Sequence, residues 1–173
     1  MIKECVVVGA GPAGLAPSRA LVERGVDHIV LEQDEVGHSW RTQRWDSFRL
    51  NTPGWMNGVL GRPERDGYAT APEVVAALDG LAAALPVQQR TPVRSLDRDA
   101  NGYVLRTPEG DLLASAVVLA TGNQNVPRVP ALAGRVAEDV QQWHAAKIAG
   151  AVARHLIKSS SPNPRSRPYG YGR

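Results

Sequence analysis

The sequence predicts an α/β fold in which a βαβ unit forms a parallel sheet and a small antiparallel β meander is added to it. Residues 2–8 are a short apolar run ending in glycine, which is typical of a strand buried on both faces of a parallel sheet. Residues 12–24 can form a helix, and Gly25 suits its C-terminal cap. Residues 28–31 are a second short strand, so the three segments predict a right-handed βαβ unit.

The chain between this unit and the next helix has no regular apolar period. Residues 33–69 contain three tryptophans and many Gly, Pro and Asn residues, which indicates a functional loop or an insertion. Thr70 and Glu73 then have the spacing of a capping box, with a proline in the first turn. They predict a helix that ends at about residue 84.

Short strands follow, and they predict the meander. Asn101-Gly102 and Glu109-Gly110 mark two turns within residues 87–119. Residues 116–120 are apolar and predict another buried strand. We therefore expect an α/β, Rossmann-like domain over residues 1–145, and a short helix with a basic, disordered tail over residues 146–173.

Composition and charge exclude several classes of protein. The single cysteine, Cys5, lies in an apolar run, so an internal disulfide and a CxxC redox pair are excluded, and a buried strand position is expected. No signal peptide and no apolar run of the ~20 residues needed for a membrane span are visible, which predicts a cytoplasmic protein.

The basic charge belongs to the end of the chain. The net charge is +3, and the last 23 residues carry five basic side chains and no acidic one, which leaves −2 for the first 150 residues. Tyr169 and Tyr171 lie among arginines, a composition that can contact nucleic acid. A tail that binds nucleic acid or a membrane surface is one interpretation. An unstructured end is the favoured one, because five charges without a fold are weak evidence for either kind of binding.

A glycine-rich turn carries the strongest functional signal. Gly9, Gly11 and Gly14, with Pro12 and Ala13 between them, stand directly after the first strand and open the first helix. The first glycine permits a tight turn, the second lets the backbone approach a pyrophosphate, and the third lets the helix pack closely on the strand. The N–H groups of the first helical turn would then meet phosphate charge.

Glu32 completes this dinucleotide fingerprint at the end of the second strand. A carboxylate there accepts hydrogen bonds from the ribose hydroxyls and repels a 2′-phosphate, so the site is expected to hold FAD or NAD and not NADP. Glycines that only mark a turn, with Glu32 solvated, are the alternative, but strand, helix and acid in register disfavour it.

Three further segments carry a resemblance to a known family. They are GHSWR at residues 37–41, DSFRLNTP at residues 46–53, and ATG at residues 120–122 with Pro127 and Pro130 behind it. In this order they resemble the flavin-containing monooxygenase-like family, which is related to the class B flavoprotein monooxygenases. The resemblance covers roughly residues 3–144 and implies FAD as the cofactor.

The resemblance implies a role for each matching residue. Trp40 and Arg41 match the segment along the FAD pyrophosphate and isoalloxazine, where Arg41 would make a forked contact with phosphate. Asn51 and Thr52 match the segment beside the flavin ring, and Asn51 is the candidate catalytic residue. The remaining candidate cofactor-binding residues are Val93 at the adenine, Gln33, Ala120, Thr121 and Gly122.

Other interpretations of these residues stay open. Trp40, Trp45 and Trp55 could cover the edge of the core, and Asn51 to Pro53 could be an ordinary turn. Gln33 and Arg44 are expected to have solvated side chains. The four histidines do not cluster in the sequence, so no metal site is predicted.

The family reaction passes a hydride from NADPH to FAD and then one oxygen atom from O₂ to a soft nucleophile or ketone. The NADPH site of the family is a second GxGxxG unit, and these 173 residues contain no second copy. We therefore expect a truncated oxidoreductase with little activity alone. A non-catalytic dinucleotide-binding or interaction module and an NAD-dependent dehydrogenase are the alternatives. The sequence indicates neither the substrate nor the oligomeric state.

Overall fold

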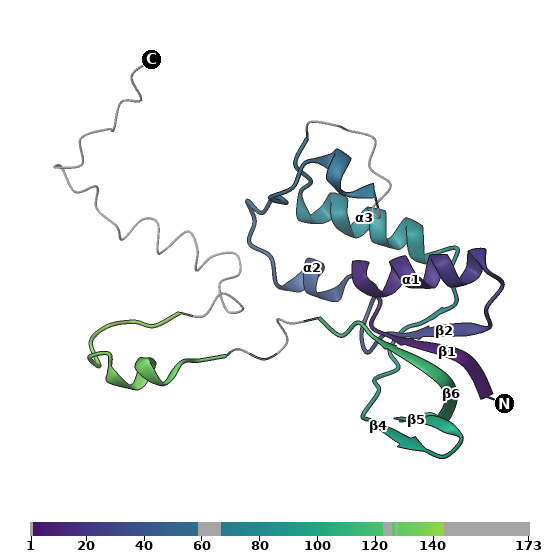
Figure 1. The fold of residues 1–173 in the computed structure, drawn as a ribbon. Coiled ribbons are helices and arrows are strands. Elements are labelled where there is room, and N and C mark those ends of the chain that lie inside the picture. The colour runs from purple at the N-terminus through teal and green to yellow at the C-terminus, as the bar shows by residue number, and fades with distance from the viewer. Residues whose placement is uncertain (1, 59–66, 123–125, 127, 144–173) are drawn as a thin grey trace.

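The computed structural model describes residues 2–58, 67–122, 126 and 128–143 of the chain (Figure 1). The described elements are β1 (Ile2–Val8), α1 (Pro12–Glu23), β2 (His28–Leu31), α2 (His38–Thr42), the 3₁₀ helix η1 (Gly54–Met56), α3 (Ala71–Ala82), β3 (Val87–Gln88), β4 (Ser95–Asp99), β5 (Gly102–Thr107), β6 (Gly110–Leu119) and the 3₁₀ helix η3 (Ala131–Arg135). The tail predicted over residues 146–173 lies outside the described residues.

The strands form one mixed sheet of six strands in the order β3-β2-β1-β6-β5-β4. Strand β1 lies between β2 and β6 and is parallel to both, and β2 also pairs in parallel with β3. The predicted βαβ unit is confirmed, since β1, α1 and β2 occupy the expected residues. Helix α1 runs through Pro17 without a break.

The antiparallel meander is also confirmed. Strand β5 pairs in antiparallel fashion with both β4 and β6, and the two connections are the turns expected at Asn101-Gly102 and Glu109-Gly110. Gly102 has φ of +136°, and a Cβ there would overlap the carbonyl oxygen of Ala114. Because both effects exclude a larger residue, this glycine brings β5 into close contact with β6.

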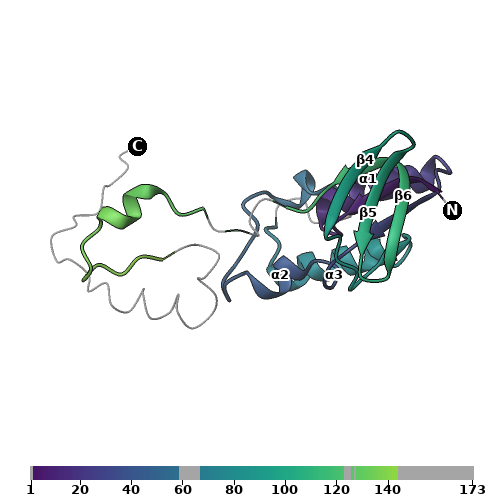
Figure 2. The same cartoon turned by 90° about the horizontal axis from the view of Figure 1, so that it is seen from below.

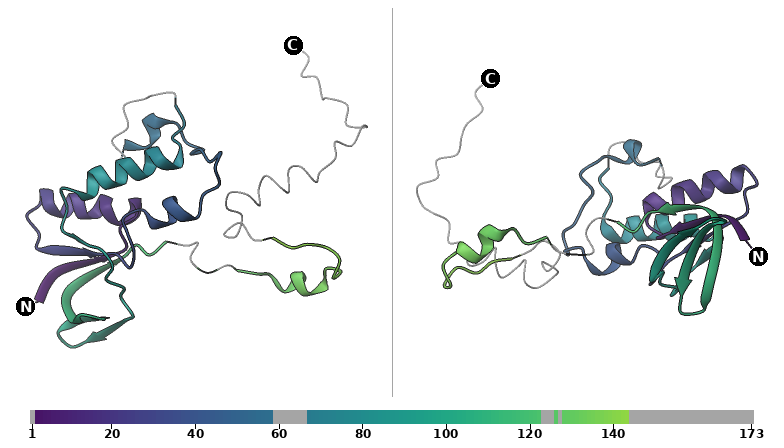
Figure 3. Two further views of the ribbon diagram at one scale, coloured as in Figure 1. Left: turned by 180° about the vertical axis from the view of Figure 1, so that it is seen from behind. Right: turned by 60° about the horizontal axis from the view of Figure 1, so that its bottom comes forward.

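The two faces of the sheet are covered by different elements (Figures 1 and 2). Helices α1 and α3 cover one face, where Leu15 and Leu78 pack with Val7 and Val30 in the larger core cluster. On the other face the twisted meander folds back, and its Leu105 packs with other buried strand residues. Both views in Figure 3 show the same layers, with the helices on one side and β4 and β5 on the other. Both faces of the central parallel strands β1 and β2 are therefore largely buried.

Three local predictions differ from the structure. The long loop after β2 contains the short helix α2, which the absence of a regular period had hidden. Helix α3 opens with the expected Thr70 and Glu73 capping box but ends at Ala82, before residue 84. The strand expected at residues 116–120 is the end of the longer β6, and its Leu119 is 64% exposed in the described part of the chain, so the expectation of a buried strand was wrong there. In residues 2–58, 67–122 and 128–143, no helix has the length and apolarity of a membrane span.

Candidate functional site

A cavity of about 430 Å³ opens where the parallel strands β1, β2 and β6 end. Its walls come from the β1–α1 turn, the end of β2, the α2 segment and the residues after β6. The carboxyl edge of a parallel sheet, where the chain departs in opposite directions, is the usual place of a ligand in such folds. The lining residues are Val8, Gly9, Gly11, Pro12, Ala13, Leu31, Glu32, Gln33, Gly37, His38, Ser39, Trp40, Gln43, Arg44, Val93, Ala120, Thr121 and Gly122.

The glycines of the β1–α1 turn have three different surroundings. A Cβ at Gly9 would overlap the backbone of Ala120, and a Cβ at Gly14 would overlap the carbonyl of Gly9. Gly11 has open space around its Cβ position and lines the cavity. Gly9 and Gly14 are therefore required by the packing of the turn, whereas Gly11 leaves room for a ligand.

The same turn presents hydrogen-bond donors to the cavity. The N–H groups of Gly14 and Leu15 both donate to the carbonyl of Gly11, at 3.0 and 2.9 Å. Within the described part of the chain, the N–H groups of Gly11 and Ala13 have no acceptor. Unpaired donors at the N-terminus of a twelve-residue helix are able to donate hydrogen bonds to an anion.

Glu32 lies beside this turn, and two backbone N–H groups hold its side chain. Its Oε2 accepts the N–H of Ala10 at 2.7 Å, and its Oε1 accepts the N–H of Asp34 at 3.1 Å. Two N–H donors fix the carboxylate at the cavity wall and leave further lone pairs for a ligand, because each oxygen accepts more than one hydrogen bond. The chain positions the acid before any ligand arrives.

Another part of the cavity lining contains Arg44, whose side chain was expected to be solvated. The guanidinium carbon of Arg44 lies 4.5 Å from the centre of the Trp40 ring and 5.6 Å from that of Phe48. Trp40 and Phe48 are themselves in edge-to-face contact, with ring centres 5.7 Å apart. Arg44 is half-buried, and this burial lowers the pKa of its guanidinium. Expected to be a solvated side chain, Arg44 instead lines the cavity beside Trp40.

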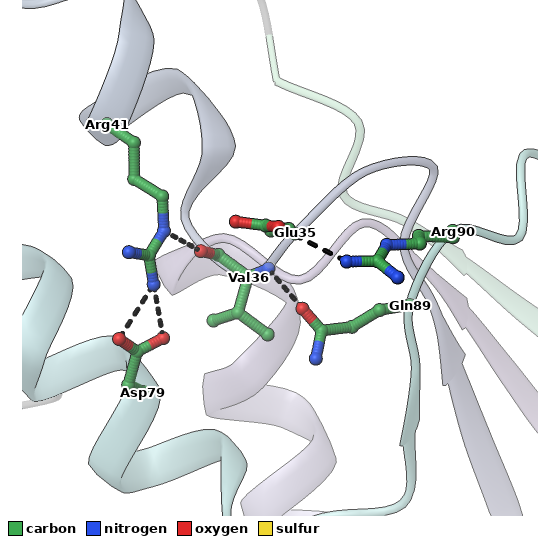
Figure 4. A network of polar contacts seen from close by, with 6 residues as sticks. All are labelled: Glu35, Val36, Arg41, Asp79, Gln89 and Arg90. Atoms are coloured by element: carbon green, nitrogen blue, oxygen red, sulfur yellow. Dashed lines mark hydrogen bonds and ion pairs between the residues drawn. The ribbon is translucent and has the colours of Figure 1, made fainter.

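Arg41 is directed away from the cavity. Its Nη2 donates to both carboxylate oxygens of Asp79 at 2.7 Å, and its Nε donates to the carbonyl of Val36 at 3.1 Å (Figure 4). It is not a lining residue. A forked contact with phosphate was expected, but in this structure Arg41 pairs through its single nitrogen Nη2 with a carboxylate of α3.

Asn51 and Thr52 also lie outside the lining of the cavity. Asn51 is exposed, and the hydroxyl of Thr52 donates to the side-chain oxygen of Asn57 at 3.1 Å. Asn57 in turn donates to the carbonyls of Thr52 and Pro53, so this segment is an internally bonded turn.

The cavity brings together most of the sequence-predicted site residues. Gly9, Gly11, Pro12, Ala13, Glu32, Gln33, Trp40, Val93, Ala120, Thr121 and Gly122 line it, whereas Gly14, Arg41, Asn51 and Thr52 do not. The lining also includes residues that were not predicted from the sequence, namely Val8, Leu31, Gly37, His38, Ser39, Gln43 and Arg44. The GxxW motif at residues 37–40 was the sequence signal that could have indicated the lining residues around Trp40. Among the described residues, no three His, Cys, Asp or Glu side chains are grouped as metal ligands.

The parallel sheet, the glycine turn and the acid at the end of β2 define a dinucleotide-binding α/β domain. The family model described as pyridine nucleotide-disulphide oxidoreductase matches residues 6–152. The chain belongs to this family. The family's description refers to disulphide chemistry, which needs two thiols. These 173 residues contain a single cysteine, Cys5, and therefore no such pair.

Similar proteins include flavin monooxygenases. An uncharacterized CzcO-like oxidoreductase of Geobacillus kaustophilus is 32% identical over 84% of this chain and 43% of its own length. Indole-3-pyruvate monooxygenase YUCCA1 of Oryza sativa is 34% identical over 75% of this chain and 34% of its own length. A flavin-containing monooxygenase structure from Stenotrophomonas maltophilia matches with a TM-score of 0.65 and 28% identity, over 75% of this chain and 42% of that one. The resemblance to flavin-containing monooxygenases is confirmed, and the chain spans less than half the length of these relatives.

Proposed function

We propose that the cavity binds the adenosine and pyrophosphate end of FAD, and that the chain is the FAD-binding part of a monooxygenase-type oxidoreductase. The observation that carries the proposal is the position of Glu32, whose carboxylate is fixed between the glycine turn and the end of β2. The similar structures support the cofactor class, since one is a flavin-containing monooxygenase and another is a steroid monooxygenase bound to NADP, at 28% identity and a TM-score of 0.60.

The residues at the cavity fit this part of FAD. The N–H groups of Gly11 and Ala13, with the charge of Arg44, suit a pyrophosphate. The carboxylate of Glu32 suits the two hydroxyls of an unphosphorylated ribose. Val93 is half-buried in the lining, where it can contact an adenine.

A bound flavin would supply the hydride and oxygen chemistry, and the protein would orient it. We assign Gly9 and Gly14 to the shape of the turn, and Ala120, Thr121 and Gly122 to the wall that leads away from the pyrophosphate. Gln33 continues the rim after Glu32, and Trp40 supports Arg44. Asn51 and Thr52 remain candidates for the flavin-ring end of the site, beyond the described cavity.

The complete reaction needs more than this cavity. In the proposed reaction NADPH reduces the flavin, and residues 1–145 form the domain that holds FAD. The printed sequence contains one GxGxxG motif, and Glu32 disfavours a 2′-phosphate at that motif. We therefore expect the 173-residue chain alone to oxidise NADPH very slowly, whatever its affinity for FAD.

Titration of the purified 173-residue chain with FAD, ADP, FMN, NAD and NADP tests the proposal. We expect saturable binding of FAD, competition by ADP, and little competition by FMN or NADP, because the cavity recognises the adenosine end. Preference for NAD over FAD would favour a dehydrogenase. Binding of none of the five would indicate a non-catalytic interaction module and would contradict the proposal.

A further inference from the structure

Helix α2 forms one wall of the cavity although it has little stability of its own. It has five residues, and its N-cap, Gly37, has φ of +68° and makes no side-chain capping hydrogen bond. Isolated helices shorter than ~12–15 residues are marginal in water, so tertiary contacts must hold this one in place. His38, Ser39 and Trp40 from α2 line the cavity.

Two neighbouring residues of α3 hold this wall from behind. The Cβ position of Gly37 lies 3.1 Å from Cδ1 of the buried Leu78, so the start of α2 packs directly on α3. One residue further along α3, Asp79 binds Nη2 of Arg41 with both oxygens at 2.7 Å. Figure 4 shows Arg41 reaching from α2 to Asp79 on α3. Gly37 and Arg41 stand at the two ends of the first turn of α2, so these contacts fix its position and its orientation.

The segment before α2 is held from the other side. The N–H of Val36 donates to the side chain of Gln89 at 2.9 Å, and the carbonyl of Val36 accepts from Nε of Arg41 (Figure 4). Arg90 and Glu35 approach to 3.5 Å, and the N–H of Arg90 donates to the carbonyl of Asp34. The segment between Glu32 and α2 is thus bonded to Arg41 of α2, which itself binds α3, and to the residues after β3.

We propose that Asp79 is a positioning residue for FAD binding: through Arg41 it holds α2 in the place where Trp40 and Arg44 line the cavity. The inference rests on the proposed function, because it concerns affinity for FAD. Asp79 is not a lining residue and acts through Arg41. If the bond is lost, α2 occupies the binding arrangement for a smaller fraction of the time, and the apparent affinity falls by that fraction.

A different role of Arg41 would reverse the expected sign. If Arg41 were itself the phosphate ligand, Asp79 would compete with the cofactor for it. Replacement of Asp79 would then free the guanidinium and leave FAD affinity unchanged or increased. Whether FAD affinity falls or rises when Asp79 is replaced therefore distinguishes the two roles of Arg41.

The test is the dissociation constant of FAD for the 173-residue chain and the variants Asp79→Asn, Arg41→Ala and their combination. We expect each single variant to weaken binding about fivefold, the upper end for a partly exposed ion pair, and the double variant to weaken it no further. Asp79→Glu keeps the carboxylate and should restore most of the affinity. Affinity of Asp79→Asn equal to or above that of the unchanged chain would overturn the proposal.

Asp27→Asn is the matched control. Asp27 also pairs with one cation, Lys3, at 2.8 Å, and the side-chain exposures of 51% and 29% are close to the 48% and 33% of Asp79 and Arg41. We expect unchanged FAD affinity for this variant. Faster hydrogen exchange of residues 37–44 in Asp79→Asn, with α1 unchanged, is the accompanying signature, and a uniform increase over the chain would contradict positioning. If the unchanged chain binds no FAD, the proposed function fails and this inference with it.

Discussion

Glu32 accepts the backbone N–H of Ala10 at 2.7 Å and thereby joins the end of β2 to the turn between β1 and α1. The same carboxylate accepts the N–H of Asp34 with its other oxygen. The acid therefore shapes the cavity from within the protein, in addition to the role proposed for it at a ribose. Shaping the cavity and binding a ribose both need the two acceptor oxygens of a carboxylate.

Glu32→Gln is expected to weaken FAD binding by about 10- to 100-fold. The amide has one acceptor oxygen, so an NH₂ group would face either the N–H of Ala10 or that of Asp34, and the hydrogen bonds to a charged group are lost. Isothermal titration with FAD measures the change. Glu23→Gln, at an exposed position on α1, is the control, and equal affinities of the two variants would contradict the role of Glu32.

Gly14→Ala is expected to destabilise the fold by about 3 kcal/mol or more, because its Cβ would overlap the carbonyl of Gly9 and neither backbone can yield cheaply. Gly80→Ala in α3 is the matched change, since its Cβ position has nothing within 4 Å, and it should stabilise by about 0.5–1 kcal/mol. Urea unfolding of both variants measures this. Similar midpoints for the two would show that the close helix–strand approach is unimportant.

Arg44→Ala is expected to weaken FAD binding about tenfold and to reduce the dependence of affinity on salt, because the charge proposed to face the pyrophosphate is removed. Arg44→Lys should restore only part of the affinity, since a lysine lacks the planar group that stacks on Trp40. Arg98→Ala is the control, because Arg98 stacks on Tyr103 in the meander at 5.7 Å. A salt dependence in Arg44→Ala equal to that of the unchanged chain would count against the assignment.

The thiol of Cys5 is expected to be inert in the folded chain. It is buried in β1, and this burial raises the pKa of the thiol, so the reactive thiolate is scarcer than in an exposed cysteine at the same pH. Alkylation by iodoacetamide at pH 8 should be slow in buffer and fast in concentrated urea. Rapid alkylation of the native protein would contradict the burial of β1. The alkylation rate of Cys5 in the native protein is expected to increase only when the pH becomes alkaline, because the pKa of the thiol is raised.

Much of the fold could be predicted because its signals are local. The apolar run of β1, the capping box at Thr70 and the two glycine turns of the meander each specify an element through neighbouring residues. Exposure of Leu119 could not be predicted, since it depends on how far the meander covers the sheet. Helix α2 was hidden because its position comes from contacts with α3, far along the chain.

The candidate site likewise contains residues that local sequence signals predict and residues whose positions depend on contacts far along the chain. The glycines and Glu32 could be predicted because the fingerprint has fixed spacing between consecutive elements. The two arginines of the α2 segment could not be told apart, because Arg41 and Arg44 are three residues apart and both follow Trp40. Only the position of Asp79 in space directs one of them to α3 and leaves the other at the cavity.

The visible absorption spectrum of the purified 173-residue chain, incubated with FAD and then separated from free flavin by gel filtration, tests the central claim most directly. We predict that the protein fraction carries flavin bands at about 370 and 450 nm, the absorption expected of bound flavin. The Glu32→Gln variant treated in the same way should retain much less. A colourless protein fraction from the folded, unchanged chain would contradict the account.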